Sequence, residues 1–301
     1  MGVINTGSIA KALWPGVIVW VGLSYKEYPP EYTKIFKKET SDKAYEEMVS
    51  LSSFGLATVK TEGGSISYDS MRQLWVTRAT HVVYNLGFIV TREAITDNQY
   101  KSLAKQRSQA LGFSMRQTKE IVHANLLNRA FNSTYTFGDG KELCATDHPT
   151  LAADFRNELT TAADLSGASL EQAGIDIAAF KNNRGLAIRV LPQALVIHPN
   201  ERYNAERILK SSLEYDTANN AINVLRGEFP KGILVNHYLT DIDAFFITTD
   251  AMNGLTTYQR WPLELSSPEA DFDTENMKVK ATERFSVTAG DPRCIFGSPG
   301  A

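Results

Sequence analysis

Residues 91–131 restrict the possible folds of this chain more than any other segment. Apolar side chains recur there at helical spacing, so one face of a helix carries a stripe for burial, and charged side chains occupy the opposite face. The stripe consists of Leu111, Met115, Thr118, Val122 and Leu126, and the charged face of Lys105, Arg116, Lys119 and Glu120. With Thr91 or Thr96 as its cap, this helix far exceeds the mean length of about a dozen residues. We therefore expect a long helix that organises the chain, with Gly112 marking a bend or a close packing contact.

The segments around this helix alternate between strand-like and helical patterns, which predicts an α+β fold. Shorter helices are expected over residues 42–50, capped by Ser41, over 169–184, with a capping box at 169–172, and over 201–213, capped by Asn200. Strands are expected over residues 57–61, 73–80, 81–90, 195–198, 232–235, 244–248, 261–265 and 277–286. The turn Glu62-Gly63-Gly64-Ser65 joins the first two strands into a hairpin.

Two segments have too little apolar surface to fold on themselves. Polar residues dominate the hairpin near its turn, and an isolated two-stranded hairpin is not stable in water. Residues 1–50 form an arm in which Pro29 and Pro30 keep the backbone extended. Trp14 and Trp20 lie in an apolar run, 13–23, that is too short to cross a bilayer and lacks a signal-peptide cleavage site. We expect these segments to pack on neighbouring chains, with no membrane partner.

Charge and cysteine content exclude several classes of protein. The 301 residues contain 31 Lys and Arg against 34 Asp and Glu, a net charge of −3. Tight nucleic-acid binding usually needs a basic excess, so only weak local contact is expected. Cys144 and Cys294 form no paired motif, so neither a zinc site nor a disulfide framework is expected, and a reducing cytoplasm is the simplest setting. A hydrophobic content of 43% allows a sizeable globular core.

No catalytic motif stands out in the sequence. Dinucleotide, P-loop, zincin and nucleophile-elbow patterns are absent. Asp147-His148-Pro149, with Asp139 and Glu142 nearby, offers one imidazole, whereas a metal site needs several converging ligands. Two carboxylate pairs (Glu46-Glu47 and Asp241 with Asp243) are typical of solvated turns, and the sequence does not place His123, expected on a helix surface, beside Cys144. We expect no catalytic, cofactor or metal site; a cytoplasmic metal-dependent enzyme using the Asp139–His148 loop stays a second alternative.

Several local motifs and the order of elements resemble one known family. Residues 137–149, FGDGKELCATDHP, resemble the segment that follows the long helix in Mu-like phage head subunits, and residues 191–199, LPQALVIHP, resemble a strand that leads into a helix. Residues 223–227, 235–239, 272–274 and 280–285 resemble later segments of the same proteins. The chain is thereby similar to the major capsid proteins of tailed bacteriophages, which have the Hong Kong 97 type fold.

The resemblance implies an organisation and a function. Residues 1–53 would be the N-terminal arm, 54–90 the projecting E-loop hairpin, 91–184 the spine helix and first part of the P-domain, 185–260 the A-domain, and 261–301 the closing P-domain strands. The chain would be a structural subunit, not an enzyme, that assembles in the host bacterial cytoplasm into the pentamers and hexamers of an icosahedral virion capsid around double-stranded DNA. Expected intersubunit contact residues are Trp14, Trp20, Lys60, Glu62, Arg72 and Trp75.

Further partners follow from the same resemblance. Some members join an E-loop lysine to an asparagine of a neighbour, with a glutamate as base; Lys60 lies in that region, and non-covalent contact is the default expectation. Many members begin with a cleaved scaffolding segment that this sequence lacks, and Met1 favours a separate scaffolding protein over a processed chain. A portal, decoration proteins and weak contact with packaged DNA complete the expected partners. An encapsulin-like shell that packages a cargo enzyme is the first alternative.

Overall fold

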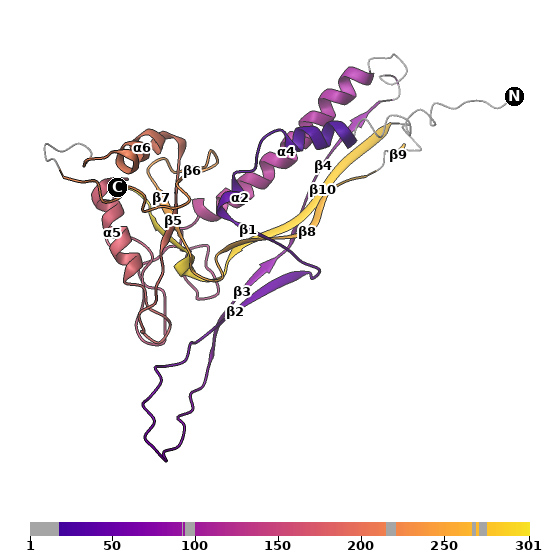
Figure 1. The fold of residues 1–301 in the computed structure, drawn as a ribbon. Coiled ribbons are helices and arrows are strands. Elements are labelled where there is room, and N and C mark those ends of the chain that lie inside the picture. The colour runs from indigo at the N-terminus through magenta and orange to yellow at the C-terminus, as the bar shows by residue number, and fades with distance from the viewer. Residues whose placement is uncertain (1–17, 92, 94–99, 215–220, 267–268, 271–275) are drawn as a thin grey trace.

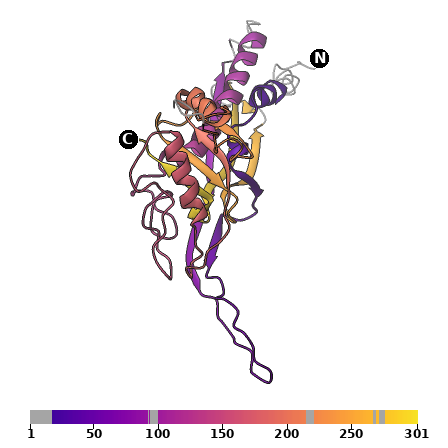
Figure 2. The same cartoon turned by 60° about the vertical axis from the view of Figure 1, so that its left-hand side comes forward.

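The protein consists of two packed bodies, from which a long hairpin projects (Figures 1 and 2). The computed structural model describes residues 18–91, 93, 100–214, 221–266, 269–270 and 276–301. Residues 18–26 are helical, and the short helix α2 (Tyr32–Ile35) follows them. Both lie along the long helix α4 (Tyr100–Asn128) in the first body (Figure 1). In the described part of the chain, no helix is long and apolar enough to cross a membrane.

The first body is α4 packed on a five-stranded sheet. The strand order is β1 (Lys37–Thr40), β8 (Leu255–Leu265), β10 (Met277–Ala289) and β4 (Val82–Val90), and the short β9 (Glu269–Ala270) also pairs with β10. β10 is antiparallel to β4 and β8, whereas β1 is parallel to β8. Buried side chains of α4 and β10 meet that of Val21 from the arm between the layers. The long helix therefore has two packed sides, one against the sheet and one against the arm.

The second body is a four-stranded sheet with two helices. The order is β11 (Ile295–Ser298), β7 (Phe245–Thr249), β5 (Pro192–Ile197) and β6 (Ile233–Val235). α5 (Gly167–Ala178) and α6 (Arg202–Lys210) contribute to its core; the 3₁₀ turn η1 (Pro199–Glu201) leads into α6, and the turn η2 (Pro292–Cys294) contacts β7. Because side chains from both faces of β5 are buried, its sequence is a continuous apolar run rather than an alternating one. This explains why the pattern located β5 and β7 to within a few residues.

The hairpin consists of a paired stem and an unpaired extension. The stem strands β2 (Tyr45–Leu51) and β3 (Gln73–Thr80) are antiparallel. Residues 52–72, the hairpin extension, project beyond the stem without forming a strand ladder (Figure 2). The predicted turn is present at the end, where Gly64 N donates to Thr61 O at 3.0 Å and Gly63 has a φ of 77°. The positive φ explains the glycine at this position.

Several elements differ from their sequence-based prediction: β8 begins at Leu255 rather than at 261, and α2, β1 and β11 were not predicted. Most of the helix predicted over 42–50 is instead the strand β2. Its backbone pairs with β3, and its side chains alternate between exposed and half-buried. The predicted strand over 57–61 does not form, since those residues lie in the unpaired extension. The helix predicted over 169–184 is shifted to α5, whose capping box is Ser166 with Ser169. The third predicted helix begins with the turn η1, capped by His198 rather than Asn200. The predicted start of the long helix falls mostly outside the described residues.

Gly112 marks a close packing contact between α4 and the arm. A Cβ atom at this position would lie 2.6 Å from the carbonyl oxygen of Val21. The Gly112→Ala variant should therefore loosen residues 18–26 from α4, although alanine favours helix by up to about 1 kcal/mol. Hydrogen exchange of residues 18–26 measures this, and faster exchange is expected. The control is Gly174→Ala in α5, where a Cβ would meet no atom within 4 Å; unchanged exchange in Gly112→Ala would contradict the contact.

Candidate assembly surfaces

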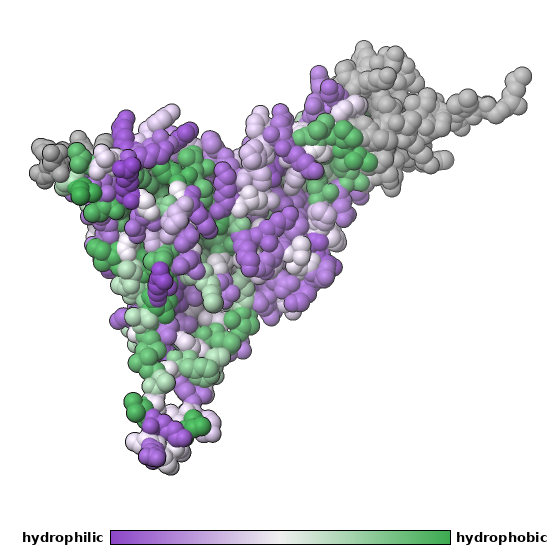
Figure 3. All heavy atoms as spheres, in the orientation of Figure 1, coloured by the Kyte–Doolittle hydropathy of each residue, from purple (hydrophilic) through white to green (hydrophobic). Residues whose placement is uncertain are grey.

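The hairpin extension exposes an unusual amount of apolar surface. Leu56, Val59 and Tyr68 are 79%, 96% and 91% exposed. Phe54, Ile66 and Met71 are exposed on the same segment, and apolar residues are visible near the tip in Figure 3. The sequence pattern emphasised the polar residues here and missed these six. Apolar side chains gathered on a projecting segment mark a surface that another protein covers.

The outward face of the stem continues this surface. Alternation along β2 leaves Tyr45, Glu47, Val49 and Leu51 exposed. Arg78 of β3 pairs with Glu47 at 2.7 Å, and its guanidinium lies 4.3 Å from the Tyr45 ring centroid. The stem thus presents a strip with an aromatic and charged end near the body and an apolar end near the extension. Such a mixed strip is typical of an interface with another folded surface.

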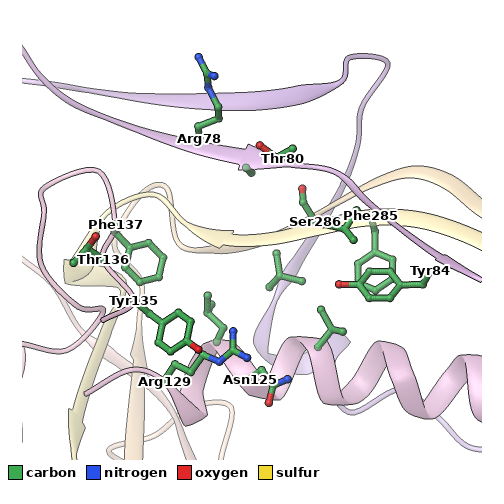
Figure 4. Close-up of a pocket in the computed structure, with 15 residues that line it drawn as sticks. Arg78, Thr80, Tyr84, Asn125, Arg129, Tyr135, Thr136, Phe137, Phe285 and Ser286 are labelled. Atoms are coloured by element: carbon green, nitrogen blue, oxygen red, sulfur yellow. The ribbon is translucent and has the colours of Figure 1, made fainter. Parts of the chain in front are cut away.

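A hollow lies between the stem and the C-terminal end of α4 (Figure 4). Its volume is about 330 Å³, and its walls come from β3, β4, α4, β10 and residues 135–137. The guanidinium of Arg129 lies 4.3 Å from the Tyr135 ring centroid, and Tyr84 stacks on Phe285 at 4.8 Å. Beside the hollow, β4 is the last strand of the sheet order. Its Val82 and Leu86 are exposed on the face that carries Tyr84, and Val83 and Ile89 are exposed on the opposite face.

The predicted contact residues do not gather at one place. Lys60 and Glu62 are exposed beside the turn of the extension, and Arg72 is exposed at its base. Trp20 is half-buried against the core around Val21 in its own chain, and Trp75 is half-buried near Phe137 and His148. Trp14 lies outside the described residues. Trp20 and Trp75 therefore pack partly within their own chain, whereas Lys60 and Glu62 are exposed on the projecting segment.

A buried polar network fastens the arm to the first body. The Glu120 carboxylate accepts from Arg116 at 2.8 Å and from the backbone N–H groups of Glu31 and Tyr32 at 3.1 Å each. Lys119 pairs with Glu283 of β10 and donates to Gln259 of β8 at 2.7 Å. Burial lowers the pKa of Lys119, and the charge of Glu283 opposes that shift. The charged helix face predicted from sequence is thus buried at Lys119 and Glu120, because the arm and sheet cover it.

His123 is also buried, which corrects its predicted position on a helix surface. Its ring lies between Tyr32 at 4.1 Å and Phe285 at 5.6 Å between centroids, with Phe36 at its edge. Nδ1 is 2.7 Å from the Lys119 carbonyl oxygen, and among the described residues Nε2 has no hydrogen-bond partner. Burial lowers the pKa of His123 to about 3, and the hydrogen bond to the Lys119 carbonyl only partly opposes it.

His123 should make stability depend on pH in mild acid. Because its folded pKa is below the unfolded value of about 6.5, the unfolded chain binds the extra proton first. The contribution of neutral, buried His123 to the free energy of unfolding is complete above about pH 6.5. It falls by roughly 1.4 kcal/mol per pH unit as the pH is lowered toward 3. Urea unfolding of the isolated chain at several pH values should show a shallower slope of stability against pH for His123→Phe than for the native chain. Equal slopes between pH 6 and 4 would mean that His123 is not the titrating group.

The Asp139–His148 loop is a structural core element. His148 Nδ1 is 2.6 Å from Asp139 Oδ2, and Nε2 is 3.0 Å from Asn157 Oδ1. Asn157 Nδ2 donates to the carbonyl oxygens of Leu143, Pro292 and Ile295, which fastens the loop to η2 and β11. In the described ranges, no group of three or more His, Cys, Asp or Glu residues is arranged to hold a metal. Cys144 and Cys294 are buried free thiols.

Comparison with solved structures identifies the class of fold. A chain of the capsid of the cyanophage P-SCSP1u superposes with a TM-score of 0.57 at 11% identity, covering 90% of this chain and 88% of that one. A chain of the bacteriophage JBD30 capsid decorated with minor capsid protein trimers superposes with a TM-score of 0.52 at 16% identity, covering 71% of this chain and 92% of that one. A chain of the virus-like particle from Pyrococcus furiosus superposes with a TM-score of 0.52 at 11% identity, covering 94% of this chain and 97% of that one. The protein thus has the Hong Kong 97 type capsid fold.

Sequence comparison then identifies the family. The family model described as phage capsid protein matches residues 75–297, which is more than half of the chain. The chain therefore belongs to the phage capsid protein family, and it is a structural capsid subunit. No curated protein sequence gives a significant match. The family match begins within β3 and includes α4 and most of both bodies, so it supports the element order that the sequence motifs indicated.

Proposed function

We propose that this chain forms the pentamers and hexamers of an icosahedral phage head around double-stranded DNA, and that it catalyses no reaction. The observation that carries this is the hairpin extension. It exposes six large apolar side chains on a segment with no strand ladder, which is stable only when another surface covers it. In a shell, that surface belongs to a neighbouring copy. Family membership and the capsid fold support the same role.

One chain must fit around both five-fold and six-fold axes. Extended elements suit this requirement, because a long hairpin can adjust its contact with a neighbour while the packed bodies keep their internal structure. We assign Lys60, Glu62 and Arg72 to this contact, since they lie exposed on the extension or at its base. Trp14, Trp20 and Trp75 stay candidates for seams along the arm and stem. Lys60 makes non-covalent contact in this proposal.

We also propose a division of the chain that follows the packing. The spine helix is α4, and the P-domain is the five-stranded sheet beneath it. The A-domain is the four-stranded sheet with α5 and α6, so it includes two elements outside residues 185–260. α5 contributes to its core and β11 pairs with β7. The E-loop is the hairpin of β2, β3 and the extension, which begins before residue 54.

Partners beyond the shell follow from the proposed role. We propose a portal and a separate scaffolding protein, assembly in the cytoplasm of the host bacterium, and only weak contact with packaged DNA. The net charge of −3 fits an inner surface that holds DNA without binding it tightly. Decoration proteins are a further candidate, because the JBD30 capsid, which has the same fold, is decorated with minor capsid protein trimers.

A second candidate is an encapsulin-like shell with a protein cargo, favoured by the likeness to the virus-like particle of Pyrococcus furiosus. Purification of native particles from infected or induced cells distinguishes the two. Nuclease-protected double-stranded DNA of uniform length inside the particles is the result expected for a phage head. Particles that hold a co-purifying enzyme and no DNA would support the second candidate. A chain that stays monomeric in the presence of its cognate scaffold would contradict both.

A further inference from the structure

The hairpin extension contacts the second body of its own subunit just beyond its base. Nη1 of Arg184 donates to Asp69 Oδ2 at 2.7 Å, and Nη2 donates to Asp69 Oδ1 at 3.0 Å. Nη2 also donates to the carbonyl oxygen of Ser70 at 2.7 Å. Both oxygens of the carboxylate face the planar guanidinium, an arrangement that fixes direction as well as distance. This two-pronged contact joins residues more than a hundred positions apart in the chain.

Asp69 also joins the two limbs of the extension. Its carboxylate accepts from Gly55 N on the opposite limb at 2.8 Å and from Ser70 N at 2.8 Å. The hydrogen bond from Gly55, followed by the contact with Arg184, lowers the pKa of Asp69. One carboxylate thus receives four donors and connects both limbs to a single cation. At the base, Ser52 N donates to Arg72 O at 2.8 Å, which gives the extension a second fixed point.

Arg184 itself is held on a rigid part of the second body. It lies in a tight turn after α5, where Asn182 N donates to Leu186 O at 2.8 Å and Asn182 Oδ1 accepts from Arg184 N at 2.9 Å. Gly185 has a φ of 82°, so this turn needs glycine there. The next side chain, Asn183, is buried and accepts from Arg293 at 2.9 Å. The guanidinium is therefore presented from a fixed position.

We propose that Arg184 and Asp69 form a latch that sets the direction of the hairpin extension before it reaches a neighbouring subunit. Without the latch, residues 52–72 would pivot about their base, because no strand ladder stiffens them. With it, the extension leaves the body in one direction and presents its apolar side chains in one orientation. The effect on assembly rests on the proposed shell function, whereas the latch within one subunit does not.

The test measures the direction of the extension through a distance. Spin labels are attached at residue 62 on the extension and residue 171 on α5, and labelled chains are diluted with unlabelled ones so that only distances within a subunit contribute. The native chain should give a single narrow distribution. Arg184→Ala should lose the narrow peak and give a broad distribution. The matched control, Arg189→Ala, removes an exposed arginine from the same connection and should keep the narrow peak.

A charge exchange separates the latch from general damage to the fold. Asp69→Arg combined with Arg184→Asp restores the ion pair but not the hydrogen bonds with Gly55 N, Ser70 N and Ser70 O, so it should give a narrower distribution than either single change and a broader one than the native chain. An unchanged distribution in Arg184→Ala, or equal broadening in Arg189→Ala, would overturn the latch. These outcomes do not depend on whether shells form, so they differ from failure of the proposed function. In shells, Arg184→Ala should increase the fraction of open or irregular particles seen by microscopy; a native proportion of closed shells would overturn the assembly role alone.

Discussion

The double substitution Val59→Asp and Tyr68→Asp is expected to abolish shell formation and leave the subunit folded. Both side chains are more than nine-tenths exposed on the extension, so the isolated subunit loses almost no internal packing. In the shell, each buried side chain contributes roughly 2 kcal/mol, and a buried carboxylate without a partner adds a further penalty of several kcal/mol. The loss recurs at every copy of the contact, which makes this the largest effect on assembly that we expect.

Sedimentation measures the result as the fraction of chain in large particles. The conservative variant Val59→Leu with Tyr68→Phe keeps the apolar surface and should assemble like the native chain. Circular dichroism and urea unfolding of the charged variant should match the native subunit to within about 0.5 kcal/mol, as is usual for exposed positions. If the charged variant forms shells with native yield, the extension does not carry the contact between subunits.

Lys119→Met is expected to destabilise the subunit by about 3–5 kcal/mol, because it leaves the Glu283 carboxylate buried without its cation. The two side chains are 3% and 2% exposed, and they connect α4 to β10 in the middle of the first body. Tyr25 donates to Glu283 at 3.2 Å, so the loss also loosens the arm. Urea unfolding of the dissociated subunit measures the change.

The matched control replaces both charges. Lys119→Met with Glu283→Met removes the ion pair without leaving an isolated charge, and such replacements are often close to neutral. The double variant should therefore recover most of the stability that the single variant loses. If the double variant is as unstable as the single one, the penalty arises from packing at Lys119 rather than from the buried charge, and the account of the network is wrong.

Local patterns predicted much of the secondary structure. β3 has the predicted bounds, and β4, β5, β7 and β10 lie within a few residues of theirs. Helical periodicity located α4, and the glycine pair located the turn at the end of the hairpin. These features depend on neighbours a few positions apart, such as i and i+4 in a helix or the central residues of a turn.

Features that depend on distant residues were not predictable from the pattern. β2 was wrongly expected to be helical. It is a strand because it pairs with β3, and this pairing is not visible in the local pattern. The burial of His123 follows from Tyr32 of the arm and Phe285 of β10, neither of which is adjacent in sequence. Likewise, the contact between Asp69 and Arg184 has no local signature. The apolar residues of the extension were visible in the sequence, but only their exposure in the fold shows their importance.

A reconstruction of assembled particles by electron cryomicroscopy tests the central claim most directly. We expect closed icosahedral shells in which residues 52–72 lie across a neighbouring subunit at every contact, with Val59 and Tyr68 buried between the two subunits. The stem should keep the β2–β3 pairing seen in the single chain. Shells in which the extension projects freely into solvent, or a chain that forms no closed particles with its scaffold, would contradict the account.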